Sequence, residues 1–330
     1  MTHTIATIYP KHWKDYELID SGNFEKLERF GPYITIRPEP QAVWERRLSE
    51  DEWKKLAHVK FVGLSSSTGK WEFYKKMPEN WSLSYQHGQL DITFNLALTK
   101  FKHVGIFPEQ SVNWDFIFER TQAIRAKGIA PKVLNLFAYT GGASLAACAA
   151  GAETYHVDSI KQVVSWANRN MESSGLKDIR WVVEDAVKFV KRERKRGKIY
   201  QGIILDPPAY GHGTDGEKWK LEEQINEMLA DVLHLLDKEH HFFILNTYSL
   251  GFSALIIENL MNDNLQKAGL PEVKADFGEL FLPSTSGQKL PLGVYCRLFY
   301  NFQKKVKRLS HDNPLQHRNI KTLLSNYPFK

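Results

Sequence analysis

The sequence predicts an α/β protein with a mostly parallel sheet, a C-terminal antiparallel hairpin and a smaller β-rich N-terminal domain. From residue 132 onward, strand-like segments alternate with helical stretches, which is the pattern of a parallel sheet with crossover helices. Residues 16–103 instead contain short aromatic and β-branched runs separated by turn residues, which is typical of a β-rich module. The 330 residues, 42% of them hydrophobic, are enough to form a core in each of two domains.

The first domain is expected to span residues 1–110. Its strand-like runs include residues 33–36, 71–74 and 90–94. A helix should follow, beginning with Asn113 as its N-cap and ending at Gly128. This helix introduces the second domain, expected at residues 111–302, after which residues 303–330 form a basic tail.

The second domain should contain five crossover helices between its strands. They are expected at residues 142–150, 160–174, 186–196, 221–236 and 252–267. The last two strands, residues 275–282 and 293–302, are separated by a turn-rich segment that leaves no room for a helix. They should therefore form a hairpin, and one of them should run antiparallel to the rest of the sheet.

Composition narrows the class of protein. The formal net charge of +6 suits a polyanionic partner but is also common among soluble enzymes. Only two cysteines occur, Cys148 and Cys296, so we expect neither a disulfide framework nor a thiolate metal site. The twelve histidines show no metal-ligand spacing, and no metal is expected. No run of about 18 apolar residues and no signal peptide is evident, so we expect a cytoplasmic protein without a membrane span.

Glycine or carboxylate signals end four successive strands of the second domain. The first strand runs into Gly141 and Gly142, where the backbone can approach a ligand and the next helix offers unpaired N–H groups. The turn lacks both the G-x-G-x-x-G spacing of dinucleotide enzymes and a Walker A lysine. Asp158 ends the second strand, where a carboxylate can accept the hydroxyls of a ribose, and Asp185 ends the third, near where an adenine would lie. Either aspartate can alternatively be a helix N-cap.

The fourth strand ends in Asp206-Pro207-Pro208. Each proline fixes its own φ angle and restricts the residue before it to extended conformations, so the backbone that leaves Asp206 is stiff. Such a turn presents rigid acceptors to a planar amino group, and Tyr210 can stack on a flipped base. The alternative interpretation is a rigid turn without a chemical role.

These residues resemble a known group of enzymes. Residues 135–142, Asp158-Ser159 and Asp206-Pro207-Pro208, with the upstream segment 104–110, are similar to class I S-adenosylmethionine-dependent methyltransferases. More narrowly, they resemble the bacterial 23S ribosomal-RNA large-subunit methyltransferases, which make 5-methylcytosine or 7-methylguanine. The resemblance implies a Rossmann-like, seven-stranded class I methyltransferase fold, S-adenosyl-L-methionine as cofactor and large-subunit ribosomal RNA as partner. The N-terminal domain would position the substrate.

The resemblance also implies roles for individual residues. Those expected to bind the cofactor are Phe107, Gln110, Asn135, Phe137, Ala138, Tyr139, Thr140, Gly141, Gly142, Asp158, Ser159, Asp185, Ala186 and Asp206. Those expected to act in catalysis are Asp206, Pro207, Pro208 and Tyr210. Two positions depart from the family pattern, because Tyr139 stands where many methyltransferases have a glycine, and Asn135 where an acidic residue is commoner.

The target atom is expected to be a base nitrogen. Members that make 5-methylcytosine use a nucleophilic cysteine after the fifth strand, and this sequence has Ser249 roughly at that place. Cys148 and Cys296 are better explained as small core residues. Two alternatives stay open at this point: a methyltransferase that acts on a protein side chain or small molecule, and an RNA-binding protein with a decayed methyltransferase fold.

Three further segments are candidates for substrate contact. Residues 188–198 carry seven lysines and arginines that either bind phosphates or form a solvated helix face. The tail from residue 304 carries more cations, interleaved with aromatic residues. Residues 211–220, which include His212, follow the Asp-Pro-Pro turn and form either a lid or a structured surface loop.

Overall fold

The computed structural model describes residues 5–65, 68–214, 216–248, 251–270 and 273–300. Its main sheet has eight strands, in the order β1 (Ile5–Ile8), β16 (Lys274–Pro283), β17 (Lys289–Phe299), β15 (Phe242–Thr247), β12 (Gly202–Leu205), β9 (Lys132–Leu136), β10 (Glu153–Asp158) and β11 (Ile179–Val183). Strand β17 is antiparallel to both neighbours, and every other pair is parallel. The expected seven-stranded sheet and its C-terminal hairpin are confirmed, and β1 adds an eighth strand beside β16.

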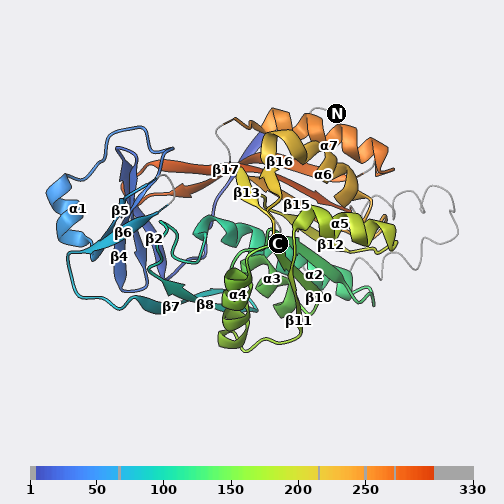
Figure 1. Ribbon diagram of the computed structural model, residues 1–330, viewed down its shortest axis with the longest axis horizontal. Coiled ribbons are helices and arrows are strands. Elements are labelled where there is room, and N and C mark those ends of the chain that lie inside the picture. The colour runs from blue at the N-terminus through green and yellow to red at the C-terminus, as the bar shows by residue number, and fades with distance from the viewer. Residues whose placement is uncertain (1–4, 66–67, 215, 249–250, 271–272, 301–330) are drawn as a thin grey trace, which may run out of the picture.

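Helices cover both faces of this sheet (Figure 1). One face carries α5 (Ala186–Lys195), α6 (Leu221–Leu233) and α7 (Ala254–Lys267), and the other carries α2 (Ser111–Arg125), α3 (Gly142–Ala149) and α4 (Lys161–Ser173). The alternation of strand side chains explains the two layers, because Leu134 and Leu136 pack with the first group while Val133 packs with the second. Among the described helices, none combines the length and apolarity that a membrane span requires.

The N-terminal part forms a sheet of its own. Its five strands are β2 (Tyr16–Gly22), β3 (Glu25–Phe30), β4 (Tyr33–Pro38), β5 (Val59–Gly63) and β6 (Gly69–Phe73). Helix α1 (Glu50–Leu56) begins with a capping box made by Ser49 and Glu52, and it buries Trp53 against this sheet. The indole of Trp53 donates to Asp20 at 2.9 Å, which ties the helix to β2.

Two contacts fasten this small sheet to the rest of the molecule. The hairpin of β7 (Asn80–His87) and β8 (Leu90–Ala97) packs against α3 and α4, and it shares one hydrophobic core with Tyr16 and Phe30 of the small sheet. At the other contact, the turn between β16 and β17 reaches β2, where the Oγ of Ser286 donates to Asp20 at 2.8 Å. The predicted boundary at residue 110 falls directly before α2, although residues 5–8 lie in the main sheet.

The start of α2 differs from the prediction. Asn113 was expected to be the N-cap, but a 3-10 turn over Pro108–Gln110 runs directly into the helix, and Gln110 is the N-cap residue. The Asn113 side chain instead donates to Gln110 at 2.7 Å and accepts from the guanidinium of Arg297 at 2.6 Å. Asn113 therefore links α2 to β17, a long-range role that its local sequence does not reveal.

Candidate functional site

A cavity of about 880 Å³ lies at the carboxyl ends of β9, β10, β11, β12 and β15. All seventeen residues predicted from the sequence to bind cofactor or to act in catalysis line it. The ends of these strands meet at one edge of the sheet, so the glycine and carboxylate residues that end four successive strands all line the same cavity. We call residues 137–142, 158–160 and 185–186 the β9–β11 wall, and residues 26, 37–39, 102–103 and 109 the N-terminal wall.

The turn after β9 has an unusual backbone. Phe137, Tyr139 and Gly141 all have positive φ angles, of 54°, 49° and 91°. For a residue with a side chain this conformation costs on the order of 1–3 kcal/mol, and such strain is concentrated at functional sites. A side chain at Gly142 would collide with the indole of Trp114, since an added Cβ would lie 2.7 Å from it. The glycine therefore allows α3 to begin close against α2.

Asn135 lies beneath this turn. Its amide nitrogen donates to Ser144 at 2.9 Å, and the hydroxyl of Ser144 lies 3.0 Å from Nδ1 of His156. Burial lowers the pKa of His156 to about 3, so its ring is neutral at physiological pH. The amide nitrogen of Asn135 is thus engaged inside the protein, in a chain of contacts that joins β9, α3 and β10.

Asp158 and Asp185 accept hydrogen bonds from the backbone in two different ways. The two oxygens of Asp158 accept from the N–H groups of Tyr139 and Ile160, each at 2.9 Å, so the carboxylate holds the strained turn. Burial raises the pKa of Asp158, and these backbone bonds oppose that shift. Asp185 is the N-cap of α5 and accepts from the N–H of Lys188 at 2.9 Å. The capping interpretation thus holds for Asp185, and both carboxylates still line the cavity.

Asp206 lies where β12 ends. Its Oδ1 accepts from the side-chain amide of Asn246 at 3.2 Å, and burial raises the pKa of Asp206 to about 6. The carbonyl oxygen of Pro208 accepts from the indole of Trp219 at 2.7 Å, which fixes the turn that follows. Asn246 itself is 2% exposed, and its Oδ1 is buried without a hydrogen-bond partner among the described residues.

The segment that follows the Asp-Pro-Pro turn, expected to be a lid or a structured surface loop, contains a short two-stranded ribbon. Strands β13 (Tyr210–His212) and β14 (Lys218–Lys220) pair in antiparallel fashion, and Trp219 packs on Phe137 with ring centroids 5.0 Å apart. The ring of Tyr210 is 53% exposed, and its hydroxyl lies 3.1 Å from Nε2 of His212. The ribbon thus contributes a largely exposed aromatic residue to the lining of the cavity.

The N-terminal wall was not predicted. It brings Lys26 from β3, Arg37 from β4, and Glu39, Lys102 and Glu109 from the segments that follow strands or precede α2. Burial raises the pKa of Glu109 to about 7, so that Glu109, like Asp158 and Asp206, is a carboxyl group of the cavity with a raised pKa. Strand-end signals after residue 132 gave no hint of this wall, because all its residues precede that point in the chain and come from several other elements. The only residues near the N-terminal wall that the sequence singled out were those of the segment 107–110.

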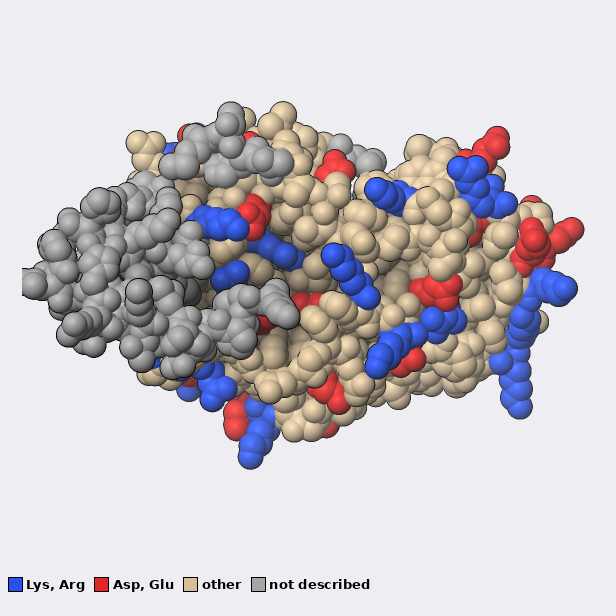
Figure 2. Space-filling model, turned by 180° about the vertical axis from the view of Figure 1, so that it is seen from behind, with Lys and Arg blue, Asp and Glu red and all other residues tan. Residues whose placement is uncertain are grey.

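The basic helix predicted as a phosphate-binding candidate proves to be largely neutralised. In α5, Lys191 pairs with Glu227 at 2.7 Å and Arg196 with Glu193 at 3.1 Å. The remaining ion pairs join Lys188 to Glu217, Arg192 to Glu184 and Arg194 to Asp231. On the face of the molecule in Figure 2, cationic and anionic side chains are interspersed in the same way. The basic tail from residue 303 and Ser249 lie outside the described residues.

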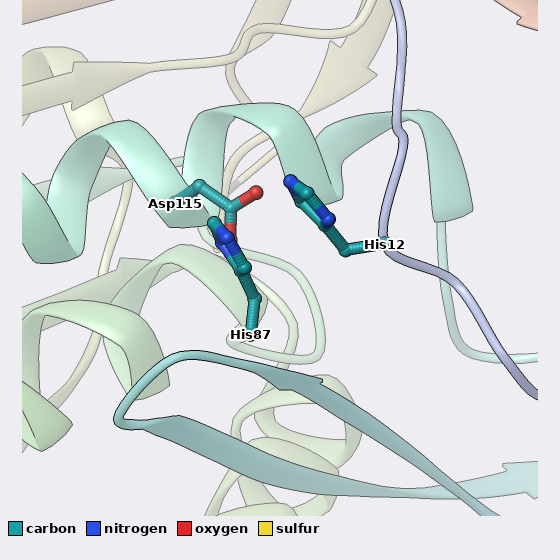
Figure 3. Close-up of side chains that lie close together, drawn as sticks. All are labelled: His12, His87 and Asp115. Carbon is teal, nitrogen blue, oxygen red and sulfur yellow. The ribbon is translucent and has the colours of Figure 1, made fainter. Parts of the chain in front are cut away.

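Three side chains outside the cavity lie as close together as metal ligands do. They are His12, His87 and Asp115, whose ligand atoms are all within 4.8 Å of one another (Figure 3). The two imidazole rings are stacked, with centroids 3.6 Å apart and planes 10° apart, so their in-plane lone pairs run side by side and do not converge on one point. Asp115 accepts from the hydroxyl of Tyr85 at 2.8 Å and lies 3.0 Å from Nδ1 of His87. In this arrangement the cluster fastens the segment before β2 onto β7 and α2.

Comparison with solved structures identifies close similarity over nearly the whole chain. A structure described as the SAM-dependent methyltransferase from Agrobacterium tumefaciens is 35% identical, with a TM-score of 0.82, over 91% of this chain and 95% of that one. A putative SAM-dependent methyltransferase from Streptococcus mutans has a TM-score of 0.64 over 87% of this chain and 76% of that one. At 16% identity, this second likeness concerns the fold alone.

Comparison of sequences indicates the same group. Residues 115–240 match the family model described as Conserved hypothetical protein 95. The ribosomal RNA large subunit methyltransferase K/L of Shewanella frigidimarina is 29% identical over 185 residues, which is 54% of this chain and 25% of the relative. The K/L protein of a Shewanella baltica strain is 26% identical over 258 residues, or 72% of this chain and 34% of the relative. The chain thus spans between a quarter and about a third of the length of these curated relatives.

Proposed function

Since this chain belongs to the S-adenosylmethionine-dependent methyltransferases, we propose that it transfers a methyl group to a base nitrogen in RNA, with large-subunit ribosomal RNA as its target. One observation carries the choice of a base nitrogen. Asp206, Pro207, Pro208 and the exposed ring of Tyr210 line the same cavity as the predicted cofactor residues. The choice of RNA is supported by the names of the curated relatives, which are ribosomal RNA large subunit methyltransferases.

The β9–β11 wall is proposed to hold the cofactor. Asp158 suits the ribose hydroxyls, because each carboxylate oxygen accepts one backbone N–H and keeps a further lone pair. Asp185 and Ala186 are proposed to lie against the adenine, and Gly141 and Gly142 against the methionine portion. The aromatic pair of Phe107 and Tyr139, with ring centroids 5.1 Å apart, is proposed to close the pocket together with Gln110.

The remaining predicted contacts follow the same turn. Phe137, Ala138 and Thr140 line the cavity with their neighbours, and Ser159 donates to the carbonyl of His212 at 3.1 Å, next to Asp158. Asn135 is proposed to support the turn from below instead of donating to the cofactor, because its amide nitrogen is bound to Ser144. These assignments are consistent with a ligand that lies across the ends of β9, β10 and β11.

Asp206 is proposed to orient the acceptor and to take up its proton. When bound, S-adenosylmethionine would supply a methyl group by cleavage of its sulfonium S–CH3 bond, which leaves the electron pair on a neutral thioether. The carboxylate of Asp206 accepts an N–H of the acceptor amine, which turns the nitrogen lone pair toward that methyl group. As the new N–C bond forms, the nitrogen loses a proton, and a carboxylate with a pKa of about 6 can receive it and pass it to solvent. The rigid turn of Pro207 and Pro208 keeps this geometry, so that alignment supplies much of the acceleration.

The positions of the cysteines favour nitrogen over carbon as the target atom. Methylation at carbon 5 of a pyrimidine needs a thiolate beside the base. Cys296 is fully buried in β17, where burial raises the pKa of its thiol, and Cys148 donates to the carbonyl of Lys177 from α3. Neither thiol lines the cavity.

The domain roles belong to the same proposal. Residues 111–302 are proposed as the catalytic domain, to which residues 5–8 contribute a strand. The small sheet within residues 1–110 is proposed to position the RNA, because it lends residues to the cavity. Action on ribosomal RNA also places the protein in the cytoplasm, as expected from its sequence.

The test is transfer to ribosomal RNA from a strain that lacks this gene. Purified protein, labelled S-adenosylmethionine and isolated large-subunit RNA are incubated, and the nucleosides are analysed by mass spectrometry. The expected product is one N-methylated nucleoside that is absent from the untreated RNA and present in RNA of the parent strain. An unchanged nucleoside profile, with the cofactor bound normally, would contradict an RNA substrate.

A further inference from the structure

The N-terminal wall concentrates the positive charge of the cavity. Among the described residues, the lysines and arginines that line it are Lys26, Arg37 and Lys102, and all three lie in this wall. Two of them have buried counter-ions. The Nζ atom of Lys26 is 3.2 Å from Glu39, and the guanidinium of Arg37 makes two contacts with Glu28, at 2.8 and 2.7 Å.

Lys102 differs from these two because its ammonium group has no counter-ion. No carboxylate of the described residues lies within 4.0 Å of it, although the side chain is partly buried. Its carbonyl oxygen accepts from the guanidinium of Arg37 at 3.1 Å, which holds Lys102 beside the other two cations. Lys26 and Arg37 are thus paired with Glu39 and Glu28, whereas Lys102 is not. Glu109, the remaining carboxyl group of the wall, forms no ion pair with Lys102, and burial raises the pKa of Glu109 to about 7, so the unpaired positive charge of the wall is that of Lys102.

The neighbouring groups respond to this excess charge. Burial lowers the pKa of His103 to about 3, and the charges of Arg37, Lys102 and Lys26 lower it further, so His103 stays neutral and adds no charge. Burial also lowers the pKa of Lys102. A partly desolvated cation without a partner is unfavourable, and an anion that enters the cavity relieves this cost.

The contacts of this wall lead to Asp206. The hydroxyl of Tyr248 donates to Glu39 at 2.6 Å, and Asn246, two residues earlier at the end of β15, donates to Asp206. In the main sheet, β12 and β15 lie on the opposite side of β9 from β10 and β11, whose ends carry Asp158 and Asp185. The N-terminal wall is thus connected to the side of the cavity where an acceptor would meet Asp206.

We propose that Lys102, supported by Lys26 and Arg37, binds a phosphate group of the nucleotide that is to be methylated. This inference rests on the proposed function, because it assumes that the acceptor is RNA. It adds that the cavity binds a phosphate group of the nucleotide as well as its base. Lysine binds phosphate as a point charge, and phosphate contacts set the position and register of a nucleic acid. A phosphate fixed at this wall would set the depth to which the base reaches toward Asp206.

The experiment replaces Lys102 by methionine, which keeps most of the side-chain length and removes the charge. The matched control is Lys100→Met, two residues away, where the side chain is exposed and does not line the cavity. Affinity for the RNA substrate is measured at several salt concentrations. K102M is expected to bind about tenfold more weakly, as for one lost charged hydrogen bond, and the salt slope should fall by about 0.7. K100M should match wild type, and K102R should restore most of the affinity.

The affinity for S-adenosylmethionine, measured by calorimetry on the same variants, separates the two possible anions. It should be unchanged in K102M. A loss of cofactor affinity with normal RNA affinity would assign Lys102 to the methionine carboxylate and overturn the proposal, as would RNA binding with a wild-type salt slope. Transfer by the wild-type protein decides the proposed function separately: if wild type methylates RNA and K102M does so equally well, only the phosphate site is refuted, whereas inactive wild type refutes both.

Discussion

The β9–β11 wall and the N-terminal wall enclose one cavity but differ in charge and in construction. The β9–β11 wall carries the carboxylates Asp158 and Asp185 and no lysine or arginine, whereas the N-terminal wall carries all three cations of the described residues that line the cavity, beside the carboxyl groups of Glu39 and Glu109. The first is made of turns that follow consecutive strands of one sheet, and the second is assembled from the five-stranded sheet, the segment after β8 and the turn before α2. This separation suits two substrates of opposite charge, a sulfonium cofactor and a polyanionic acceptor, because each meets a wall that attracts it.

The largest effect is expected where the two walls meet, at Asp206. Asp206→Ala removes the acceptor for the amine proton, so kcat should fall by roughly 10²–10⁴-fold, the usual contribution of a positioned acid or base. The affinities for S-adenosylmethionine and RNA should stay close to wild type. Single-turnover transfer and calorimetry measure the two quantities. If D206A lost cofactor affinity instead of turnover, Asp206 would belong to the β9–β11 wall alone.

The next effect tests the β9–β11 wall by itself. Asp158→Ala removes a carboxylate that holds Tyr139 and is proposed to bind the ribose, and loss of such charged hydrogen bonds corresponds to roughly 10–100-fold weaker cofactor binding. RNA affinity should not change. Asp158→Asn is the matched control, since its oxygen can still accept one backbone bond. Normal cofactor binding by D158A would show that Asp158 does not bind the ribose and that the cofactor is wrongly placed at the β9–β11 wall.

The pH dependence of the rate tests, without a mutation, whether Asp206 takes up the proton of the acceptor. Because the carboxylate is the active form and burial raises its pKa to about 6, kcat/KM should rise roughly tenfold per pH unit below pH 6 and level off above it. At pH 5 the rate should be about a tenth of the plateau. Initial rates between pH 5 and 8, with cofactor binding followed in parallel, give the profile. A rate that is flat across pH 6 would remove Asp206 from the proton transfer.

The smallest effect concerns the link between the N-terminal wall and β15. Tyr248→Phe removes the hydroxyl that donates to Glu39, so KM for RNA should rise a few-fold, in line with one hydrogen bond to a charged group at a partly exposed position. The value of kcat and the affinity for the cofactor should be retained. Steady-state kinetics with RNA as the varied substrate measures this effect. A kcat loss as large as that of D206A would mean that Tyr248 contacts the reacting atoms.

The sequence predicts the residues of one wall better than those of the other, and the reason is the way in which each wall is assembled. Residues 137–142, Asp158, Asp185 and Asp206 each stand directly after a strand, and parallel strands end at one edge, so local patterns placed them together. Lys26 and Arg37 are brought to the cavity by the docking of the five-stranded sheet, and Lys102 by the segment that follows β8, and no local pattern records either contact.

Charge patterns were less informative than strand ends. The seven cations of residues 188–198 formed the densest basic run in the described part of the chain, yet most pair with carboxylates of α5, α6 and neighbouring segments. Two of those partners, Glu227 and Asp231, are more than 30 residues away along the chain, while Glu184 and Glu193 are local. Asn113 was mispredicted for a related reason, since its partner Arg297 lies on β17. A side chain whose partner is remote cannot be interpreted from its neighbours.

Strand β1 has a consequence for the order in which the protein folds during synthesis. Ile5 pairs with Phe277, so the backbone of β1 stays unpaired during synthesis until a segment far along the chain has been made. The fit is close at Gly278, where an added Cβ would lie 1.7 Å from the carbonyl oxygen of Ala6. Completion of this outer edge therefore requires that synthesis has passed β16, and a nascent chain halted before residue 274 should leave residues 5–8 open to proteases.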